Sequence, residues 1–483
     1  MKWPQSASRT ERYSRRGDYL LLFLLLLLSA CTASDHGFRS LDSNSGDSSF
    51  WVNLRSQPQL AAAPAIRSFA ARGQFVMDEL QRNASSSQAS LIAFLQQQHV
   101  QYEPYWISNS IWVRADAATR KQIAAMPEVE SIEPDIPIQL PKPPDASSPA
   151  PSPGEVSSDL VVEWNVKRTR APEVWDTYGT KGDGIVVGVL DSGFEPHPAL
   201  NAQYRGYRSG SSFANDYNWR SMVSGDSAKC LKAPCDDSGH GTHVTGTIIG
   251  HVGNHIYGVA PNAKFIACRG ISGTSGPIGG VVKCLQWFLA PSDLNGKNPT
   301  PALRPQILNI SLGGRTSGVL AQALLNLHVA GTLVVAASGN NGGCNTMGYP
   351  ALYPAVVAVG ALNYESDTVA VFSSGGSAGV AKPDVVAGGA QVTSAWLNGG
   401  YRTINGTSMA APAVSGVAAL MMSVVPDLVD KPADVAYLLR LSANKNVNAS
   451  PGRNCTASML TGAGEVDAYR AIGEATFPRA FPQ

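Results

Sequence analysis

Between residues 161 and 475, continuous apolar runs alternate with stretches of helical periodicity. Runs that are apolar at every position are typical of strands buried on both faces of a parallel sheet. We therefore expect an α/β fold here, a three-layer domain in which helices cover both faces of the sheet. The expected strands are "GIVVGVLD", "AKFIAC", "QILNISL", "GTLVVAAS" and "AVVAVGA", and the expected helices are "VVKCLQWFLA", "GVLAQALLNLHVAG" and "SMAAPAVSGVAALMMSVV".

A second pattern occupies residues 69–140 and predicts a small α+β domain in front of the large one. The expected order is strand, helix, strand, helix, strand. These elements are carried by "GQFVMDEL", "SSSQASLIAFLQQQHV", "SIWVRADA", "AATRKQIAAMPEV" and "ESIEPDIPIQL".

Two segments lack either periodicity. Residues 31–68 are rich in Ser, Asp, Asn, Ala and Gln and predict a flexible tether. Residues 141–160 are rich in Pro, Ser, Ala and Gly and predict an exposed linker, a kind of segment that proteases cut readily. Residues 476–483 form a short tail.

The longest apolar run, residues 19–30, lies near the N-terminus. It is too short for a membrane-spanning helix, which takes roughly 20 residues. Basic residues precede it and small residues follow it, which is the layout of a secretory signal peptide over residues 1–30. The run ends in "LSAC", which resembles the bacterial lipobox, and this resemblance implies that Cys31 carries the lipid. An ordinary signal peptide with an incidental Cys stays open as the alternative.

Composition changes this picture little. Charged residues make up 15% of the 483 residues and the net charge is +1, so nothing indicates nucleic acid as a partner. The low charge and 47 glycines suit a tightly packed globular enzyme better than a disordered hub.

Seven cysteines are an odd number for an exported chain. With Cys31 assigned to lipid, the other six can form three disulfides, in any of about 15 connectivities. We favour Cys230 with Cys235, because the Pro in "CLKAPC" suits a tight loop. The remaining four then pair as Cys268 with Cys284 and Cys344 with Cys455, although other pairings stay open. Zinc is the competing interpretation, but no second close pair of cysteines supports it.

Two candidate catalytic residues follow predicted strands or begin helices. Asp191 ends "GIVVGVLD", where an Asp in a local turn is the commoner explanation. His240 and His243 stand in "DDSGHGTHVTGTIIG", at the start of an apolar and helical stretch. Their spacing differs from that of a HExxH metal pair, in which two ligands lie one helical turn apart with a Glu between them.

Two further residues complete the candidate chemistry. Ser408 begins a strongly apolar helix, where it suits either an N-cap or a nucleophile whose developing charge the helix N-terminus stabilises. Asn340 follows the strand "GTLVVAAS" and is either a turn residue or a donor to an oxyanion.

Each signal is weak alone, but together they follow the chain order Asp, His, Asn, Ser. The motifs "LDSG", "HGTHVTGT", "SLGG", "ASGN" and "NGTSMAAP" resemble those of the subtilisin-type serine proteases, over residues 161–475. The segments "HPALNAQYRGY", "QWFLAPSDLNG" and "GNNGGCNTMGYPALYP" resemble the bacillopeptidase F branch of that family.

The resemblance implies a secreted serine endopeptidase acting on proteins or peptides. Ser408 would be the nucleophile, His240 the base and Asp191 the residue that orients it. Asn340 and the Ser408 N–H would hold the oxyanion, while His243 would only pack in its helix. Substrate would lie along "SLGG", through Ser311, Leu312 and Gly313, and the pocket for the residue before the cut would be lined by Ala337, Ser338 and Gly339.

The same resemblance makes residues 69–140 an inhibitory propeptide, the chain's own intramolecular partner, and residues 141–160 the processing region. Membrane association would come only from the lipid on Cys31, and self-cleavage would release the enzyme to the periplasm or the extracellular space. We expect no cofactor and no metal, because Ala199 in "HPAL" stands where the family often has a calcium-binding Asp. A catalytically dead homologue and a metal hydrolase using His240, His243 and Asp191 remain the rival hypotheses.

Overall fold

The computed structural model describes residues 47–141, 148–150, 159–377, 379–452 and 455–476. The expected signal peptide, Cys31 and most of the linker lie outside the described residues.

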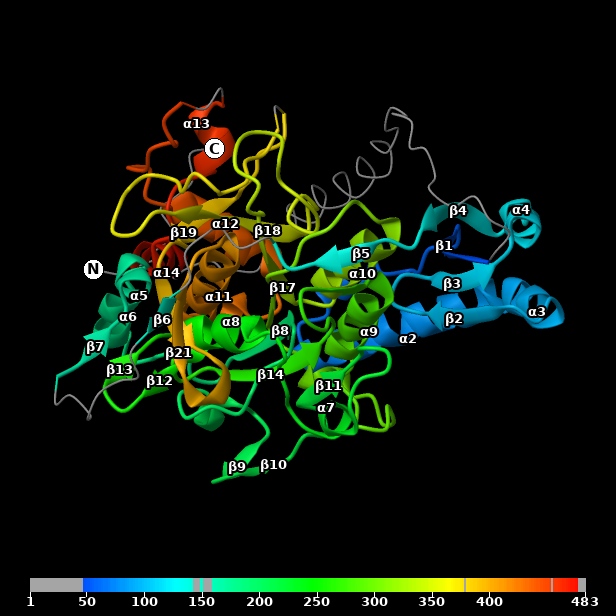
Figure 1. Cartoon of the computed structure of the whole chain (residues 1–483), viewed down its shortest axis with the longest axis horizontal. Helices are drawn as coiled ribbons and strands as arrows, with labels where there is room; N and C mark the ends of the chain where they lie inside the picture. The colour runs from blue at the N-terminus through cyan, green and yellow to red at the C-terminus, as the bar shows by residue number, and fades with distance from the viewer. Residues whose placement is uncertain (1–46, 142–147, 151–158, 378, 453–454, 477–483) are drawn as a thin grey trace, which may run out of the picture. The chain divides into compact units, whose positions relative to one another are not determined.

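The large domain is built on a seven-stranded sheet in which every strand pair is parallel (Figure 1). All five strands expected from the apolar runs belong to it, and the α/β prediction is confirmed. In spatial order the strands are β11 (Trp219–Ser221), β14 (Lys264–Arg269), β8 (Val186–Asp191), β16 (Ile307–Ile310), β17 (Leu333–Ala337), β18 (Val356–Leu362) and β19 (Val385–Gly388).

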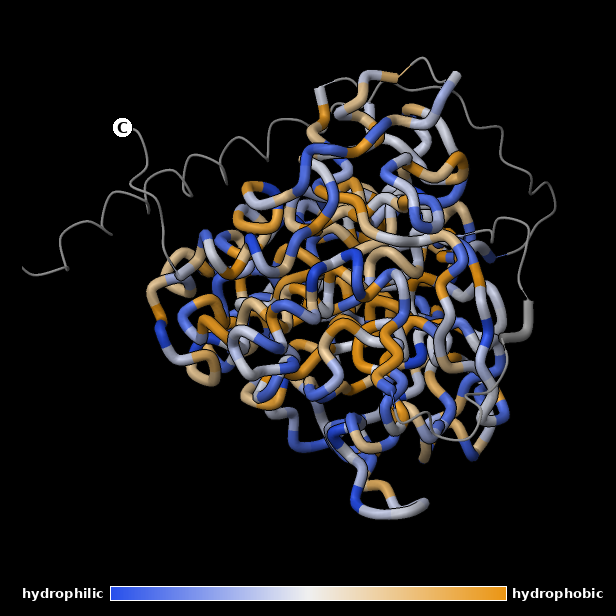
Figure 2. Tube along the Cα trace, turned by 90° about the vertical axis from the view of Figure 1, so that its left-hand side faces the viewer, coloured by the Kyte–Doolittle hydropathy of each residue, from blue (hydrophilic) through white to orange (hydrophobic). Residues whose placement is uncertain are grey.

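Helices cover both faces of this sheet, because its side chains alternate between two apolar cores. Val187 and Val189 of β8 face one core together with α8 (His240–Ile249) and α11 (Thr407–Val424). Leu190 faces the other, together with α9 (Ile278–Leu289) and α10 (Gly318–Val329). Figure 2 shows that the most hydrophobic segments gather in the interior.

The three helices expected in this domain are present as α9, α10 and α11. Among the described helices, α11 is the one long and apolar enough to cross a membrane, but 89% of its most apolar window is buried inside the fold. It is a core helix. The remaining helices of the domain are α5 (Trp164–Arg168), α6 (Ala171–Tyr178), α7 (Ala228–Lys232), α12 (Pro432–Ser442), α13 (Ala457–Thr461) and α14 (Ala468–Thr476).

The small domain has a four-stranded antiparallel sheet. Its strands, in spatial order, are β2 (Gln101–Tyr105), β3 (Ser110–Ala115), β1 (Ser48–Leu54) and β4 (Val129–Pro134), and its helices are α2 (Phe69–Ser87), α3 (Ala89–Gln97) and α4 (Ala117–Ala124). One face of the sheet packs on α3 and α4, while Trp51 and Tyr105 join the core of α9 and α10.

Two expectations for this domain are wrong. "GQFVMDEL" is not a strand but part of α2, because its buried side chains Val76, Leu80 and Ala84 recur four residues apart, on one helical face. The flexible tether does not extend to residue 68, because Ser48–Leu54 forms the interior strand β1, in which Phe50, Trp51 and Val52 are buried. The polar residues around this short apolar segment concealed it.

The stretch expected as one strand, "ESIEPDIPIQL", is divided into β4 and β5 (Pro137–Gln139), and β5 pairs with β15 (Ser275–Pro277) of the large domain. Within the linker, β6 (Ser148–Ala150) pairs with β21 (Tyr401–Ile404), so these three residues are not an unpaired spacer. Other small strands are β7 (Val161–Val162), β9 (Tyr207–Ser209), β10 (Ser212–Phe213), β12 (His251–Val252), β13 (His255–Ile256) and β20 (Val392–Ala395).

Candidate active site

Asp191 is the last residue of β8 and is fully buried. Its Oδ1 accepts a hydrogen bond from the backbone N–H of Ser192 at 2.7 Å. Carboxyl ends of parallel strands are where such folds gather their chemistry, and the sheet places this carboxylate in the middle of that edge.

His240 is the first residue of α8, and its Nδ1 lies 2.8 Å from Oδ1 of Asp191. Burial alone would lower the pKa of His240, but the charge and hydrogen bond of Asp191, helped by the charge of Asp236, raise it above its ordinary value. The Asp191 contact places the proton on Nδ1, which leaves Nε2 as the basic atom of the neutral ring.

Asp236 fixes the start of α8 and was missed by the sequence reasoning. Its two oxygens accept from the backbone N–H groups of Gly239 and Thr242, each at 3.0 Å. Ser192 Oγ also donates to Asp236 and accepts from the N–H of Gly241. The carboxylate therefore ties the turn after Asp191 to the helix that carries His240. An Asp just before a helix start is the signal that could have found it.

Ser408 is the second residue of α11 and is 2% exposed. Its Oγ donates to the backbone carbonyl of Ser311 at 3.4 Å, and Ser311 Oγ donates to the carbonyl of Ser408 at 3.0 Å. Within the described chain no hydrogen bond joins His240 to Ser408. The contact between Asp191 and His240 is thus formed, whereas the contact that would complete a triad is not.

Asn340 is oriented by the residue just before Ser408. Its Oδ1 accepts from both the N–H and the hydroxyl of Thr407, each at 2.9 Å, which directs its amide nitrogen to the other side. A Cβ built on Gly406 would lie 3.3 Å from Asn340 Nδ2 and 3.6 Å from the Ser408 nitrogen. The Asn340 amide nitrogen and the Ser408 backbone nitrogen therefore both lie close to one point beside Gly406.

The residues expected to contact substrate have different surroundings. Gly313 exchanges two backbone hydrogen bonds with Gln139 of the small domain, at 2.8 and 2.7 Å. The backbone of the "SLGG" segment is thus already paired with an extended strand. Leu312 is instead buried in the core. Ala337 ends β17, and Ser338 and Gly339 follow it toward Asn340.

His243 lies on the same helix as His240 but has different surroundings. Its Nε2 contacts the backbone carbonyls of Val392 and Arg402 at 3.1 and 3.0 Å. Burial, together with the charges of His240 and Arg402, lowers the pKa of His243 to about 3. Among the described residues, His240, His243 and Asp191 do not form a group of metal-ligand atoms, so this geometry does not support the metal hydrolase hypothesis.

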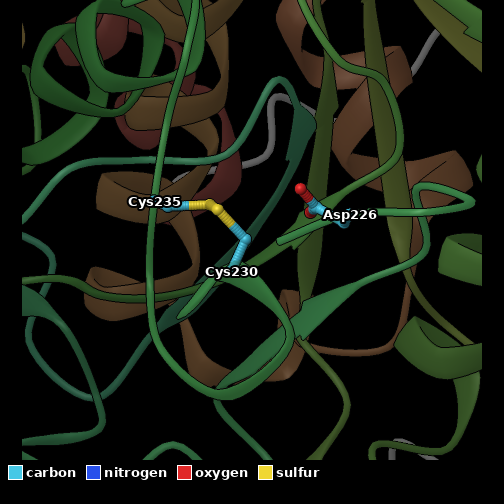
Figure 3. Close-up of side chains that lie close together, drawn as sticks. All are labelled: Asp226, Cys230 and Cys235. Carbon is cyan, nitrogen blue, oxygen red and sulfur yellow. A yellow bond between two sulfur atoms is a disulfide. The ribbon is translucent and has the colours of Figure 1, made fainter. Parts of the chain in front are cut away.

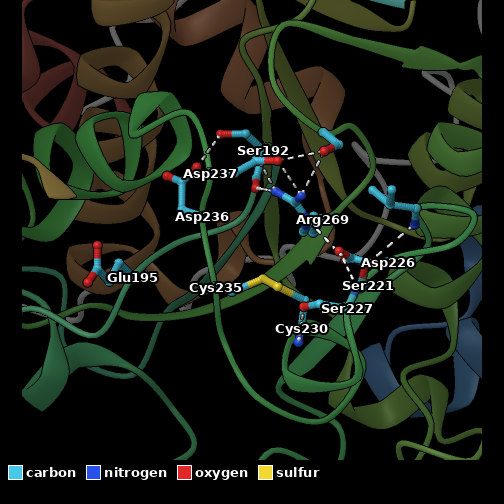
Figure 4. The surroundings of a disulfide bond; sticks show 12 residues. Ser192, Glu195, Ser221, Asp226, Ser227, Cys230, Cys235, Asp236, Asp237 and Arg269 are labelled. Carbon is cyan, nitrogen blue, oxygen red and sulfur yellow. Dashed lines mark hydrogen bonds and ion pairs between the residues drawn. A yellow bond between two sulfur atoms is a disulfide. The ribbon is translucent and has the colours of Figure 1, made fainter. Parts of the chain in front are cut away.

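The loop before His240 is held by an ionic network that the sequence did not reveal (Figure 4). The buried guanidinium of Arg269 bonds both oxygens of Asp237, at 2.9 and 2.8 Å, and Oδ2 of Asp226 at 3.0 Å. It also donates to the backbone carbonyl of Ser192. Arg269 ends β14 and pairs in register with Asp191, so it connects this loop to the strand end that carries the catalytic candidate.

Cys230 and Cys235 close the same loop through a disulfide, next to Asp226 (Figure 3). Asp226 and the two sulfurs lie within 4.8 Å of one another. They are a poor metal site all the same, because bonded sulfurs offer no thiolate. The structure also contains the two other disulfides that we favoured, Cys268 with Cys284 and Cys344 with Cys455.

A doubly covered parallel sheet that carries Asp, His, Asn and Ser in this order and arrangement defines the class of subtilisin-like proteins. The model of the subtilase family matches residues 182–459, and the chain belongs to that family.

Three relatives show how far the likeness extends. Bacillopeptidase F of Bacillus subtilis is 34% identical over 367 residues, which cover 72% of this chain and 25% of the relative. The minor extracellular protease Epr of the same organism is 31% identical, over 70% of this chain and 46% of its own length. Subtilisin Savinase of Lederbergia lenta is 38% identical, over 54% of this chain and 84% of its own length. The chain thus spans less than half of each of the first two.

Proposed function

We propose that this protein is a serine endopeptidase that hydrolyses peptide bonds in proteins. The observation that carries the proposal is the 2.8 Å contact of His240 with buried Asp191, on the same edge of the fold as Ser408. The names of the relatives, which include a protease and a subtilisin, agree with this activity.

In the proposed reaction Ser408 Oγ attacks the scissile carbonyl carbon while Nε2 of His240 takes its proton. The imidazolium then gives that proton to the leaving amine, and Asp191 stabilises the positive ring. Water enters next and hydrolyses the ester on Ser408 by the same steps in reverse order. The raised pKa of His240 supports its part, because a base must hold the proton it takes.

Substrate binding would also move the Ser408 hydroxyl into place. The carbonyl of Ser311 now accepts from Ser408 at 3.4 Å. An extended substrate that lies antiparallel to the 311–314 segment would offer its own N–H to that carbonyl and displace the hydroxyl, which then bonds His240. We infer that the His240 contact of Ser408 forms only with such a substrate bound.

The negative charge that develops on the carbonyl oxygen would be held by the Ser408 N–H and the Asn340 amide. The positive end of the α11 dipole would add to this effect, since Ser408 lies in the first turn of that helix. The pocket beside Ala337, Ser338 and Gly339 would receive the side chain before the cut.

The small domain would act as an inhibitor attached to its own enzyme. Its segment from Pro137 to Gln139 already occupies the backbone positions along Gly313 and β15 that a substrate would use. We propose that the precursor is exported, carries its lipid on Cys31, and is cut between the two domains. The cut would free the protease from its anchor, and the name of the extracellular relative agrees with release outside the cell.

We propose no cofactor and no metal in the reaction itself. Casein hydrolysis tests the whole proposal: the wild type should cleave denatured casein, a serine-directed phosphonate should stop it, and a chelator should not. Ser408→Ala should be inactive while keeping the wild-type circular dichroism spectrum. Loss of activity with the chelator alone would instead favour the metal hydrolase.

A further inference from the structure

A two-stranded hairpin connects the helix that carries His240 with the helix that carries Ser408. Its strands are β20 and β21, which pair antiparallel with Ala395 opposite Tyr401. On one side β20 packs against α8. On the other side the chain runs from the end of β21, at Ile404, directly into α11. The hairpin therefore contacts both helices of the candidate site.

The body of the hairpin is fastened to α8 near the start of that helix. Nε2 of His243 contacts the carbonyl of Val392 in β20 at 3.1 Å and the carbonyl of Arg402 in β21 at 3.0 Å. In addition, Ser394 Oγ donates to the carbonyl of His243 at 2.9 Å. Both strands are thus attached to the helix that begins at His240.

Trp396, the first residue after β20, lies against the residue that precedes the candidate base. A Cβ built on Gly239 would lie 2.6 Å from Cε2 and 2.7 Å from Cζ2 of Trp396. Gly239 also has a φ of 81°, in the left-handed region that favours glycine. The indole therefore contacts the backbone from which His240 extends, and no larger residue fits at position 239.

The indole is itself held in place. The backbone N–H of Trp396 donates to the carbonyl of Gly400 at 2.7 Å, which closes the turn of the hairpin. The guanidinium carbon of Arg402 lies 4.6 Å from the centroid of the indole ring, within the range of a cation–π contact. Further along the turn, the N–H of Asn398 donates to Oε2 of Glu195 at 3.1 Å. These contacts give the ring one defined position beside α8.

We propose that Trp396 is a positioning residue for the base, an inference that rests on the proposed function. The side chain of His240 is held at Nδ1 by Asp191, while no hydrogen bond in the described chain joins His240 to Ser408. How well Nε2 meets the serine hydroxyl therefore depends on where the backbone places the start of α8. The indole fixes that start at Gly239, and the hairpin that carries the indole leads to Ser408.

Removal of the indole should slow the chemical step more than it weakens substrate binding. Trp396→Ala leaves the backbone at Gly239 uncovered, so the start of α8 can shift. A misplacement of about 1 Å can cost about 10² in rate, and we expect kcat to fall at least about tenfold with KM changed less than about twofold. Trp396→Phe keeps an aromatic ring at this position and should restore most of the lost rate.

The test uses the full-length chain and its variants, refolded and left to process. Casein hydrolysis then gives kcat and KM per active site, counted by titration with a fluorophosphonate. Leu397→Ala is the matched control, because Leu397 is the next residue of the same turn and is also half-buried. It should keep kcat within about twofold of the wild type. If circular dichroism shows that Trp396→Ala does not fold, Trp396→Leu replaces it, since leucine keeps apolar volume without a flat ring.

Four results would decide against the inference or against the function on which it rests. An unchanged kcat in Trp396→Ala, or in Trp396→Leu where that variant replaces it, overturns the positioning role. A rise in KM alone also overturns it, because the indole would then be a substrate contact. An equal loss of kcat in Leu397→Ala would show a disturbed hairpin instead of a specific contact and overturns it as well. A wild type that hydrolyses no casein refutes the proposed function instead.

Discussion

His240 and Asp191 lie 49 residues apart in the chain, yet Nδ1 of one is 2.8 Å from Oδ1 of the other. The contact depends on two local features, a parallel strand that ends at Asp191 and a helix that begins at His240. The carboxylate is completely buried, so its charge acts on the imidazole with little screening by solvent.

The first prediction concerns pH. The base must be neutral to act, so activity should fall as the pH drops through the pKa of His240, which is raised above 6.5. In Asp191→Asn only the charge of Asp236 still opposes the effect of burial on the pKa of His240, so the acid limb of kcat/KM should move to lower pH. The rate should also fall by about 10⁴, a magnitude carried over from other serine proteases. Profiles of kcat/KM against pH check both; a limb that stays in place in the variant would contradict the role of Asp191.

The second prediction concerns the oxyanion site. Asn340→Ala removes one of the two donors beside Gly406 and should lower kcat about 10²- to 10³-fold with little change in KM, a magnitude carried over from the subtilisins. Steady-state kinetics measure the effect. Asn341→Ala is the matched control, because that neighbouring side chain is exposed. Similar losses in both variants would indicate a disturbed loop rather than a missing donor.

The third prediction concerns the contact between the domains. Glu133 of the small domain accepts from the N–H groups of Gly318 and Val319, at 2.9 and 3.0 Å, at the start of α10. Glu133→Ala should weaken the hold of the cleaved small domain on the enzyme by about 1 kcal/mol, or roughly fivefold in Kd. Recovery of activity on dilution of the processed complex measures this. Glu130→Ala, an exposed change on the same strand, should have no effect.

The fourth prediction concerns Arg269. Arg269→Met leaves the carboxylates of Asp226 and Asp237 without their shared cation and should lower the free energy of unfolding by about 3 kcal/mol. The Asp191 end of β8 should shift as well, with a fall in kcat. Urea unfolding and kinetics test this beside Arg208→Met, an exposed control. An unchanged unfolding midpoint would show that the network contributes nothing measurable.

The sequence predicted the large domain well, for a physical reason. Strands such as β8 and β17 are buried on both faces, so their apolar runs are visible without knowledge of any partner. The residues placed around the candidate site were likewise marked by motifs at strand ends and helix starts. Their proposed roles remain to be tested.

What the sequence did not predict depends on distant partners. The partners of Arg269 in Asp237 and of Glu133 in Gly318 lie 32 and 185 residues away, and no local pattern links them. The strand β1 was hidden because a short apolar segment stands among polar residues. Helix α2 was mistaken for a strand because the short window "GQFVMDEL" conceals its four-residue repeat.

The most direct test of the central claim is covalent labelling by a fluorophosphonate, followed by mass spectrometry of the labelled peptide. We predict one adduct, on Ser408, that forms in the processed wild type and is absent from Ser408→Ala. Labelling should also be slower in Asp191→Asn, because His240 then activates the serine poorly. Labelling that persists in Ser408→Ala, or an adduct on another residue of the wild type, would contradict the account.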